Sequence, residues 1–419
     1  MWYNATEEKK GVLREMKKII ESLETEVKYS ADVVVCGGGF AGISAALAAR
    51  RRGSDVILLE RGFMLGGLGT AGLVTIYLPL CDGMGHQVSF GIAEELFRLS
   101  IEHGAEDRYP AAWLDGGSFE EKRDGQRFQV RYNASLFAIS AERVLKDEGV
   151  KILYGATAVA VSESDSRIDA VVIEGKSGRE AIEVRKCVVD TTGDADICNF
   201  SSAKTAEFKY ANTLAAWYYY YAEGKFDLNT LGFADIIPED GGAIAETNKP
   251  LVRRRFKGLD TEEISEMMIA SHRAIEEDIL KRREAGERDL FPTTIASTPQ
   301  LRMTRRLVGL YDMVSTDDHA YFEDSVGMVG NWRKRGPIYE IPFRSLYGKE
   351  VKNLLSAGRC MSSGDSLWEI TRVIPVCAVT GEACGVAAAM TDDLSSLDVK
   401  ELQKALRENG VKLHIDEIM

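Results

Sequence analysis

The sequence predicts an α/β protein built on a central parallel sheet, with a three-stranded antiparallel β-meander, flanking helices and an inserted α+β domain. Three observations support this fold class. A short apolar run, residues 32–36, is followed by glycines and an alanine-rich helix, and a second apolar run ends at Glu60. Three segments of alternating polarity follow between residues 157 and 185. From about residue 200 to 340 the pattern changes to aromatic strands and a long polar helix.

Residues 32–60 have the order strand, glycine turn, helix and strand that a right-handed crossover requires. Gly37, Gly39 and Gly42 form a Gly-x-Gly-x-x-Gly motif. Gly37 permits the sharp turn, Gly39 lets the backbone approach a pyrophosphate, and Gly42 lets the helix pack closely on the strand. Glu60 follows Gly42 by 18 residues, where a carboxylate accepts ribose hydroxyls. The unit predicts a dinucleotide-binding site.

A second glycine-rich segment, residues 61–72, follows this acid directly. Here the sequence resembles the FAD-dependent oxidoreductases of the glutathione-reductase superfamily, in the branch related to succinate dehydrogenase and fumarate reductase flavoproteins. The resemblance implies a glutathione-reductase-type FAD-binding domain, in which the second glycine turn covers the ribityl and pyrophosphate of FAD. NAD-dependent dehydrogenases usually lack this turn. The FAD contacts that it implies in both segments are Gly37, Gly39, Phe40, Ala41, Gly42, Glu60, Arg61, Gly66, Gly67, Leu68 and Gly69.

Residues 133–153 predict a helix that ends at Gly149 and then a short strand. The meander follows, and after it comes a separate apolar strand, residues 187–190. The same order of elements occurs in the family. There, the turn after the last strand passes near the cofactor, and a backbone group of the meander meets the adenine. The resemblance therefore implies cofactor contacts at Thr192, Gly193 and Asp194, and at Val159, which is matched by order alone.

Two further motifs lie in the C-terminal part of the chain. Residues 353–363 predict a strand with Gly358 at its C-terminal end, and ligands of parallel sheets bind at such ends. Pro375 then opens a helix of small residues that reaches Met390. In the family, the N-terminus of this helix faces the flavin pyrimidine ring, where its dipole stabilises negative charge. The contacts implied here are Gly358, Arg359, Pro375 and Val376.

The resemblance covers residues 31–410 and implies how the chain is divided. The FAD-binding domain is discontinuous and comprises residues 31–80, 130–200 and 345–395. Residues 81–129 and 201–344 form the substrate domain, and within it residues 104–128 are predicted to be a loop. Residues 1–30 and 396–419 lie outside both domains, as an N-terminal amphipathic helix and a C-terminal helix with a tail.

Three segments outside the cofactor motifs predict further elements. Residues 6–28 carry apolar side chains at helical spacing, which predicts a helix that packs on the protein body or on a second subunit. Residues 214–221 predict a strand whose alternate tyrosines either line a pocket over the flavin or pack in the core. Thr261 is predicted to cap a polar helix to about Arg283, and Asp398 a final amphipathic helix.

The composition argues against several classes of function. The chain has 52 Lys and Arg against 65 Asp and Glu, a net charge of −13, so neither nucleic acid nor an anionic membrane is an expected partner. Seven scattered cysteines show no metal-ligand spacing and no redox pair, which is typical of a reduced, cytoplasmic protein without a bound metal. We also expect no transmembrane helix and no secretion signal.

The resemblance implies an FAD-dependent oxidoreductase that transfers a hydride between a small organic substrate and flavin N5. The arginines near the expected site favour a carboxylate on that substrate. The electron acceptor stays open between a second substrate, a quinone, another protein and oxygen, and a homo-oligomer is also left open. Two alternatives remain: an NAD-linked dehydrogenase, and a non-redox or electron-carrying FAD-binding subunit of a larger complex.

The candidate catalytic residues are Arg372, Arg305 and His86. Arg372 comes directly before the flavin-facing helix and is the first choice for binding a substrate oxyanion, with Arg305 and Arg306 as further candidates. For each, an ion-paired structural arginine is the alternative interpretation. His86 lies in a glycine-bearing loop and is either a substrate ligand, an acid–base group, a covalent flavin link or a loop histidine with a structural hydrogen bond.

Overall fold

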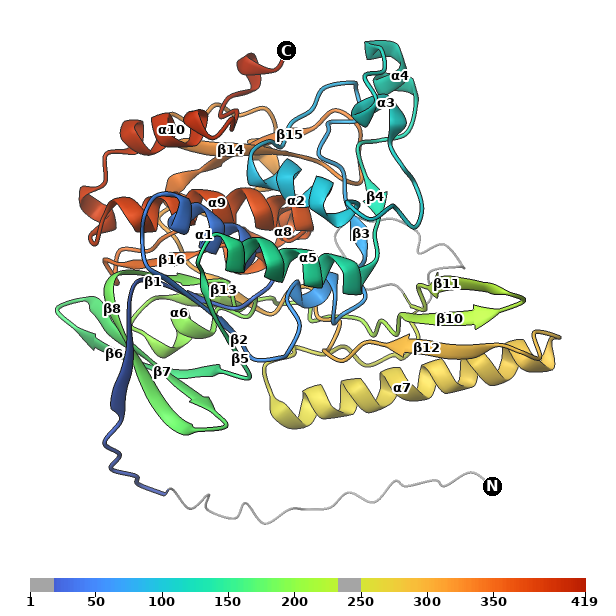
Figure 1. Ribbon diagram of the computed structural model, residues 1–419, viewed down its shortest axis with the longest axis horizontal. Coiled ribbons are helices and arrows are strands. Elements are labelled where there is room, and N and C mark those ends of the chain that lie inside the picture. Colours follow the sequence, from blue (N-terminus) through green and yellow to red (C-terminus); the bar gives the residue numbers. More distant parts are fainter. Residues whose placement is uncertain (1–18, 233–249) are drawn as a thin grey trace.

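The computed structural model describes residues 19–232 and 250–419, and a seven-stranded sheet lies at its centre. Its strands are β1 (Glu26–Cys36), β2 (Val56–Glu60), β5 (Lys151–Tyr154), β6 (Thr157–Ser164), β7 (Arg167–Gly175), β8 (Gly178–Asp190) and β16 (Leu354–Ser356). Their order is β5-β2-β1-β8-β7-β6, and β16 pairs with the end of β8 (Figure 1). Strands β5, β2, β1, β8 and β16 are parallel, whereas β7 and β6 complete an antiparallel meander.

Alternate side chains of β1 face two separate layers of the core. Val33 and Val35 are fully buried in the cluster that contains helices α1 (Phe40–Arg51) and α9 (Ile374–Met390). Val34 and Cys36 are buried on the other face of the sheet, in a second cluster to which the strands of the meander also contribute side chains. A strand buried on both faces explains why residues 32–36 are an uninterrupted apolar run.

Two glycines bring helix α9 against helix α1. A Cβ atom added at Gly381 would lie 2.3 Å from the carbonyl oxygen of Ala41, and one at Gly385 would lie 2.2 Å from that of Ala45. Helices α2 (Ile92–Ser100) and α5 (Ala134–Asp147) pack beside this pair (Figure 1). The small residues predicted in α9 therefore serve its approach to a neighbouring helix.

One carboxylate is buried within this layer of helices. Glu382, on α9, is 1% exposed, and it accepts hydrogen bonds from the backbone N–H of Ile92 (2.8 Å) and the side chain of Asn409 (3.4 Å). Burial raises the pKa of Glu382 to about 7, and neighbouring Glu95 adds to the rise while Arg51 opposes it. The neutral acid is thus the form that the folded protein favours.

We expect Glu382 to make the folded protein less stable as the pH rises from about 4.5 to about 7. The folded protein retains this proton while the unfolded chain releases it, so the contribution is complete below pH 4.5 and is lost towards pH 7. The free energy of unfolding should fall by about 3 kcal/mol across this range. Denaturant titrations of the wild type and of E382Q, at matched pH values, give the free energy of unfolding of each protein as a function of pH. The contribution of Glu382 is the difference between these two pH profiles. Parallel profiles would contradict the prediction.

The middle of the chain folds into a smaller sheet supported by a long helix. Strands β10 (Tyr218–Ala222), β11 (Lys225–Asn229) and β12 (Phe291–Ile295) pair in the antiparallel order β11-β10-β12, beside α7 (Thr261–Glu284) (Figure 1). Tyr218 of β10 packs between the small sheet and α7, in a cluster with Ile275 and Ile279 of that helix. The division into an FAD-binding and a substrate domain stays a prediction.

Short elements connect these parts. The two-stranded pairs are β9 (Thr205–Glu207) with β13 (Arg305–Leu307), β14 (Ser325–Gly330) with β15 (Ile338–Pro342), and β3 (Ile76–Tyr77) with β4 (Val130–Arg131). The remaining α-helices of the described residues are α3 (Ala111–Leu114), α4 (Phe119–Asp124), α6 (Asp196–Phe200), α8 (Asp365–Thr371) and α10 (Val399–Glu408). Within residues 19–232 and 250–419, we find no individual helix with the length and apolarity that crossing a membrane requires.

The predicted N-terminal helix over residues 6–28 is wrong in its described part. Residues 19–25 are not helical, and Glu26 already begins β1, whose register pairs it with Glu180 of β8. The long β8 offers backbone hydrogen bonds to this segment, and that pairing overrides the helical spacing of its apolar side chains. Leu23 and Val27 are each 58% exposed. Residues 6–18 of the prediction lie outside the described residues.

Four smaller predictions also need correction. The third meander strand and the strand at 187–190 are one strand, β8, because polar Arg185 binds Asp32 and Asp55 at the surface and does not interrupt it. The aromatic strand begins at Tyr218, not at residue 214. Helices α3 and α4 lie within the predicted loop at 104–128. Asp260 caps α7 in place of Thr261, since its carboxylate accepts the N–H of Glu263 (2.9 Å).

Candidate functional site

A cavity of about 580 Å³ lies at the carboxyl ends of β1, β2, β8 and β16. Seven stretches of chain that are distant in sequence form most of its wall. They are residues 36–41, 59–64, 66–69, 156–158, 191–194, 297–302 and 357–359. Ligands of parallel sheets bind in this position, where loops and helix N-termini replace the strands.

The glycine turn after β1 leaves one side of the cavity open to a ligand. A Cβ at Gly37 would lie 2.4 Å from the carbonyl oxygen of Thr191, and one at Gly42 would lie 1.8 Å from that of Gly37. A Cβ at Gly39 would meet no atom within 4 Å. Gly39 is the N-cap of α1, and no side chain caps the helix there. The first N–H groups of α1 therefore suit a phosphate or another anion.

Glu60 joins the two glycine-rich segments. One of its carboxylate oxygens accepts the N–H of Gly38 (3.0 Å), and the other accepts the N–H of Gly62 (2.6 Å). The second segment is attached to the first at Gly66, whose N–H donates to the carbonyl of Gly38 (2.8 Å). Gly66 has a φ of +100°, a conformation that favours glycine. Glu60 thus lines the cavity and fixes the position of both turns.

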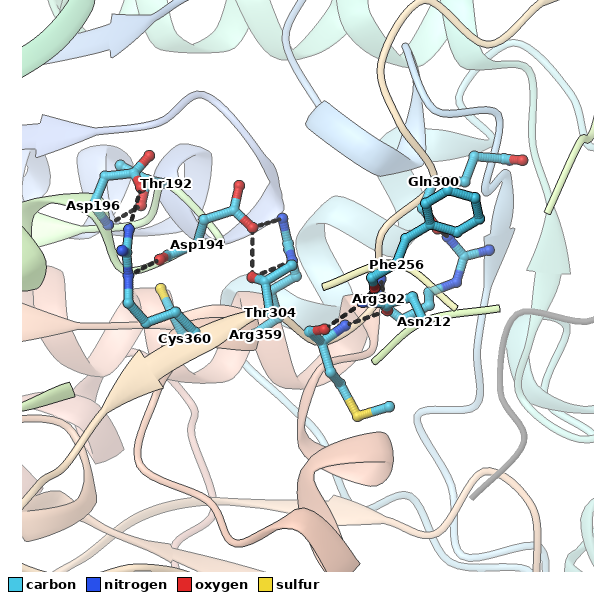
Figure 2. A network of polar contacts seen from close by, with 12 residues as sticks. Thr192, Asp194, Asp196, Asn212, Phe256, Gln300, Arg302, Thr304, Arg359 and Cys360 are labelled. Atoms are coloured by element: carbon cyan, nitrogen blue, oxygen red, sulfur yellow. Dashed lines mark hydrogen bonds and ion pairs between the residues drawn. The ribbon is translucent and has the colours of Figure 1, made fainter. Parts of the chain in front are cut away.

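A network of acids and arginines lies beside the cavity, after the end of β8, and Figure 2 shows part of it. Arg359 donates to the carboxylate of Asp194 (2.7 Å), which also accepts the hydroxyl of Thr304 (2.6 Å). Arg305 donates to Asp196 (2.7 Å) and to the backbone carbonyl of Asp194 (2.9 Å). Burial raises the pKa of Asp196 to about 6, and the nearby acids Asp194 and Asp190 add to that effect.

The structure brings most of the expected cofactor residues to this one cavity. Those that line it are Gly37, Gly39, Phe40, Ala41, Glu60, Arg61, Gly66, Gly67, Leu68, Gly69, Thr192, Gly193, Asp194, Gly358 and Arg359. Gly42, Val159, Pro375 and Val376 are not lining residues. Gly42 instead sets the distance between α1 and the turn, and Ala156, Thr157 and Ala158 occupy the wall near Val159.

The three expected catalytic residues are separated. Arg372 lines the cavity at the junction of α8 and α9, with its side chain 8% exposed and 3.8 Å from the carboxylate of Glu369. Arg305 holds Asp196 and does not line the cavity. His86 also lies outside the lining: its ring hydrogen-bonds to Asp82 (2.8 Å) and packs against Phe119. Arg306, a further candidate, forms a two-point ion pair with Asp312.

Arg302 lines the cavity but is not among the candidate residues predicted from the sequence. It is 3% exposed, and its guanidinium carbon lies 5.3 Å from the centre of the Trp217 ring. Its backbone N–H donates to the side chain of Asn212 (2.9 Å), and its Nη1 donates to the carbonyl of Gln300 (3.1 Å) (Figure 2). Its position at the start of the arginine-rich stretch that contains Arg305 is the one sequence feature that could have indicated it.

Two cysteines near Arg359, Cys377 and Cys360, are in environments that keep them protonated. Cys377 lines the wall, and burial raises the pKa of its thiol to about 11. Cys360 lies behind Arg359 and is fully buried, which raises the pKa of its thiol to about 12. Because the thiolate is the reactive form, neither group is prepared for thiol redox chemistry.

A parallel sheet whose strand ends carry a phosphate-compatible glycine turn, the acid Glu60 and a second glycine turn around one cavity is the arrangement expected of an FAD-binding oxidoreductase. A family model described as FAD dependent oxidoreductase matches residues 32–213 and 219–406, and the chain belongs to this family. The expected family, fold class and FAD cofactor are confirmed, and the protein is an enzyme of this class.

Solved structures of similar fold have low sequence identity. A geranylgeranyl bacteriochlorophyll reductase-like protein from Thermoplasma acidophilum is 10% identical over 91% of this chain and 82% of that one, with a TM-score of 0.46. The p-nitrophenol 4-monooxygenase of Pseudomonas putida is 11% identical over 92% and 84%, with a TM-score of 0.47. The 3-ketosteroid-Δ4-(5α)-dehydrogenase of Rhodococcus jostii is 17% identical over 88% and 98%, with a TM-score of 0.38. No curated protein matches the sequence.

The residues present fit FAD. The open side of Gly39 and the uncapped N-terminus of α1 suit the pyrophosphate, and Glu60 is placed for the adenosine ribose. The cavity of about 580 Å³ extends from these groups to Arg359 and Arg372. When bound, FAD supplies the redox chemistry, and the protein contributes binding, orientation and charge.

Proposed function

We propose that this oxidoreductase transfers a hydride between flavin N5 and a small organic substrate that bears a carboxylate. The observation that carries the proposal is the pair Arg302 and Arg372, two buried arginines on the wall of the cavity assigned to FAD. They come from different segments, residues 297–302 and the α8–α9 junction, and both residues line the same cavity.

Two guanidinium groups on one cavity wall are well suited to a carboxylate. Each presents a planar set of N–H donors, and hydrogen bonds between arginine and carboxylate are short, directional and charge-assisted. Burial strengthens such contacts because water does not compete for the same oxygens. The role of the two arginines is to bind and orient the substrate, so that its reacting carbon faces the flavin.

An anaerobic titration of the FAD-loaded protein tests the proposal. The yellow absorption of the oxidised flavin should be bleached by a 2-hydroxy acid or a saturated dicarboxylate, and not by the corresponding amide or methyl ester. The acid and its uncharged derivative have the same carbon skeleton, so the pair isolates the carboxylate. Equal bleaching by the acid and the ester, or bleaching by uncharged compounds alone, would overturn the proposal.

A further inference from the structure

A second hollow, of about 340 Å³, lies beside strand β10 and shares no lining residue with the FAD cavity. Its lining residues are Leu73, Glu106, Arg131, Asn133, Ala134, Ser135, Tyr219, Phe226, Thr293 and Thr294. They come from strands β4, β10, β11 and β12, from the start of α5 and from the loops around residues 73 and 106. Its volume suits one or two small rings.

A row of aromatic side chains leads across the small sheet to this hollow. Tyr221 on β10 lies opposite Phe226 on β11 and Phe291 on β12, with ring centres 5.1 Å and 5.3 Å from its own. Phe226 is 69% exposed and Phe291 is 45% exposed. Side chains alternate along a strand, so Tyr219 lies on the same face as Tyr221, while Tyr218 packs towards α7. An exposed aromatic surface thus continues into a polar hollow.

The charged groups of the hollow are already paired with one another. Glu106 accepts hydrogen bonds from Tyr219 (2.7 Å) and from Asn133 (3.1 Å). The Nε atom of Arg131 lies 3.5 Å from Glu106, and its Nη2 donates to Asp227 (2.6 Å). Two carboxylates therefore surround one guanidinium, which disfavours an anionic ligand.

Hydroxyl groups supply the rest of the polar lining. Ser135, Thr293 and Thr294 each contribute a hydroxyl, which both donates and accepts hydrogen bonds. Glu106, whose carboxylate has lone pairs beyond those that accept from Tyr219 and Asn133, adds a further acceptor to the same lining. A ligand that matches this wall carries several neighbouring hydroxyls and a C–H face that packs on an aromatic ring.

We propose that the hollow and the aromatic row bind a neutral sugar ring, at a site separate from the one where the substrate reacts. The segment between the two sites joins them physically. Ala71, Val74 and Ile76 line the FAD cavity, whereas Leu73 lines the hollow in a left-handed conformation, with φ at +57°. The hydroxyl of Thr75 lies 2.9 Å from that of Tyr219. A sugar that hydrogen-bonds to the Tyr219 hydroxyl competes with its contacts to Thr75 and Glu106, and therefore changes the surroundings of the FAD cavity through this segment.

Saturation-transfer NMR on the FAD-loaded protein tests this site, with methyl glucosides, methyl galactosides and maltose as probes and with phosphate and acetate as competitors. At least one sugar should receive saturation at its ring C–H protons, and neither anion should displace it. F226A should weaken binding by about tenfold, because it removes the aromatic face. F200A, which truncates a partly exposed phenylalanine on α6, is the matched control and should bind normally.

Two further results complete the test. The bound sugar should shift the visible spectrum of the flavin in the wild type, and the shift should be lost in Y219F, which lacks the hydroxyl beside Thr75. The proposal is overturned if no probe binds, if F226A binds as the wild type does, or if phosphate displaces the sugar. These readouts do not depend on turnover, so they are independent of the carboxylate proposal.

Discussion

A Gly39→Leu variant is expected to fold normally and to be isolated without FAD. The backbone at Gly39 has φ −72° and ψ −177°, which any L-residue adopts, and an added Cβ meets no atom within 4 Å. A leucine side chain would therefore occupy the space left for the ligand without disturbing the chain. Loss of several charge-assisted hydrogen bonds to the pyrophosphate should weaken FAD binding by a factor of at least about 10².

Two other substitutions in the same turn make this result interpretable. Gly39→Ala adds a single methyl group and should weaken FAD binding less than leucine does. Gly42→Ala should instead destabilise the fold, because its Cβ would lie 1.8 Å from the backbone oxygen of Gly37. The flavin absorbance per mole of protein and the thermal unfolding of each apoprotein separate the two effects. A Gly39→Leu protein that retains a full complement of FAD would show that the cofactor lies elsewhere.

Replacing either buried arginine of the cavity should lower kcat/KM for the carboxylate substrate by about a hundredfold. A hydrogen-bonded pair with a charged group contributes about 1.5–3 kcal/mol, and a buried pair lies towards the upper end of this range. R302M removes both charge and donors, whereas R302K keeps the charge and loses the planar arrangement, so lysine should restore only part of the activity. We expect the same pattern for R372M and R372K.

The esterified substrate and a surface arginine are the controls for this prediction. The wild type should discriminate strongly between the acid and its methyl ester, and R302M and R372M should lose most of that discrimination. R143K, on the exposed face of α5, should leave kcat/KM unchanged, because the Arg143 side chain is 49% exposed and pairs with Glu102 at the surface. The FAD content of each variant must equal that of the wild type. A variant that loses activity equally towards acid and ester would contradict a role in carboxylate binding.

Local sequence patterns predicted the strand–turn–helix unit at residues 32–60. The turn at Gly37, Gly39 and Gly42 and the acid at Glu60 could be located because each role depends on a residue type at a fixed spacing within one short unit. The same holds for the cap of α10, where Asp398 accepts a backbone N–H group as the sequence indicates. These predictions hold because the role of each residue depends on its neighbours in the sequence.

Contacts between distant segments were harder to predict. The choice among the arginines depended on which side chain reaches the cavity, and Arg302 and Arg372 do so, whereas Arg305 and Arg306 turn to Asp196 and Asp312. All four are compatible with the same sequence pattern. Likewise, residues 26–29 join β1 because β8 lies beside them, 153 or 154 residues further along the chain, and not because of their own propensity.

The sequence by itself therefore determined the strand–turn–helix unit at residues 32–60, because glycine conformation, helix N-termini and an acid at the next strand are local properties. Tertiary structure alone decided which arginines line the FAD cavity and which pair with acids away from it. It also decided that a second, polar hollow lies behind the 71–76 segment. The physical reason is that packing selects one partner for each long side chain among several that local sequence allows.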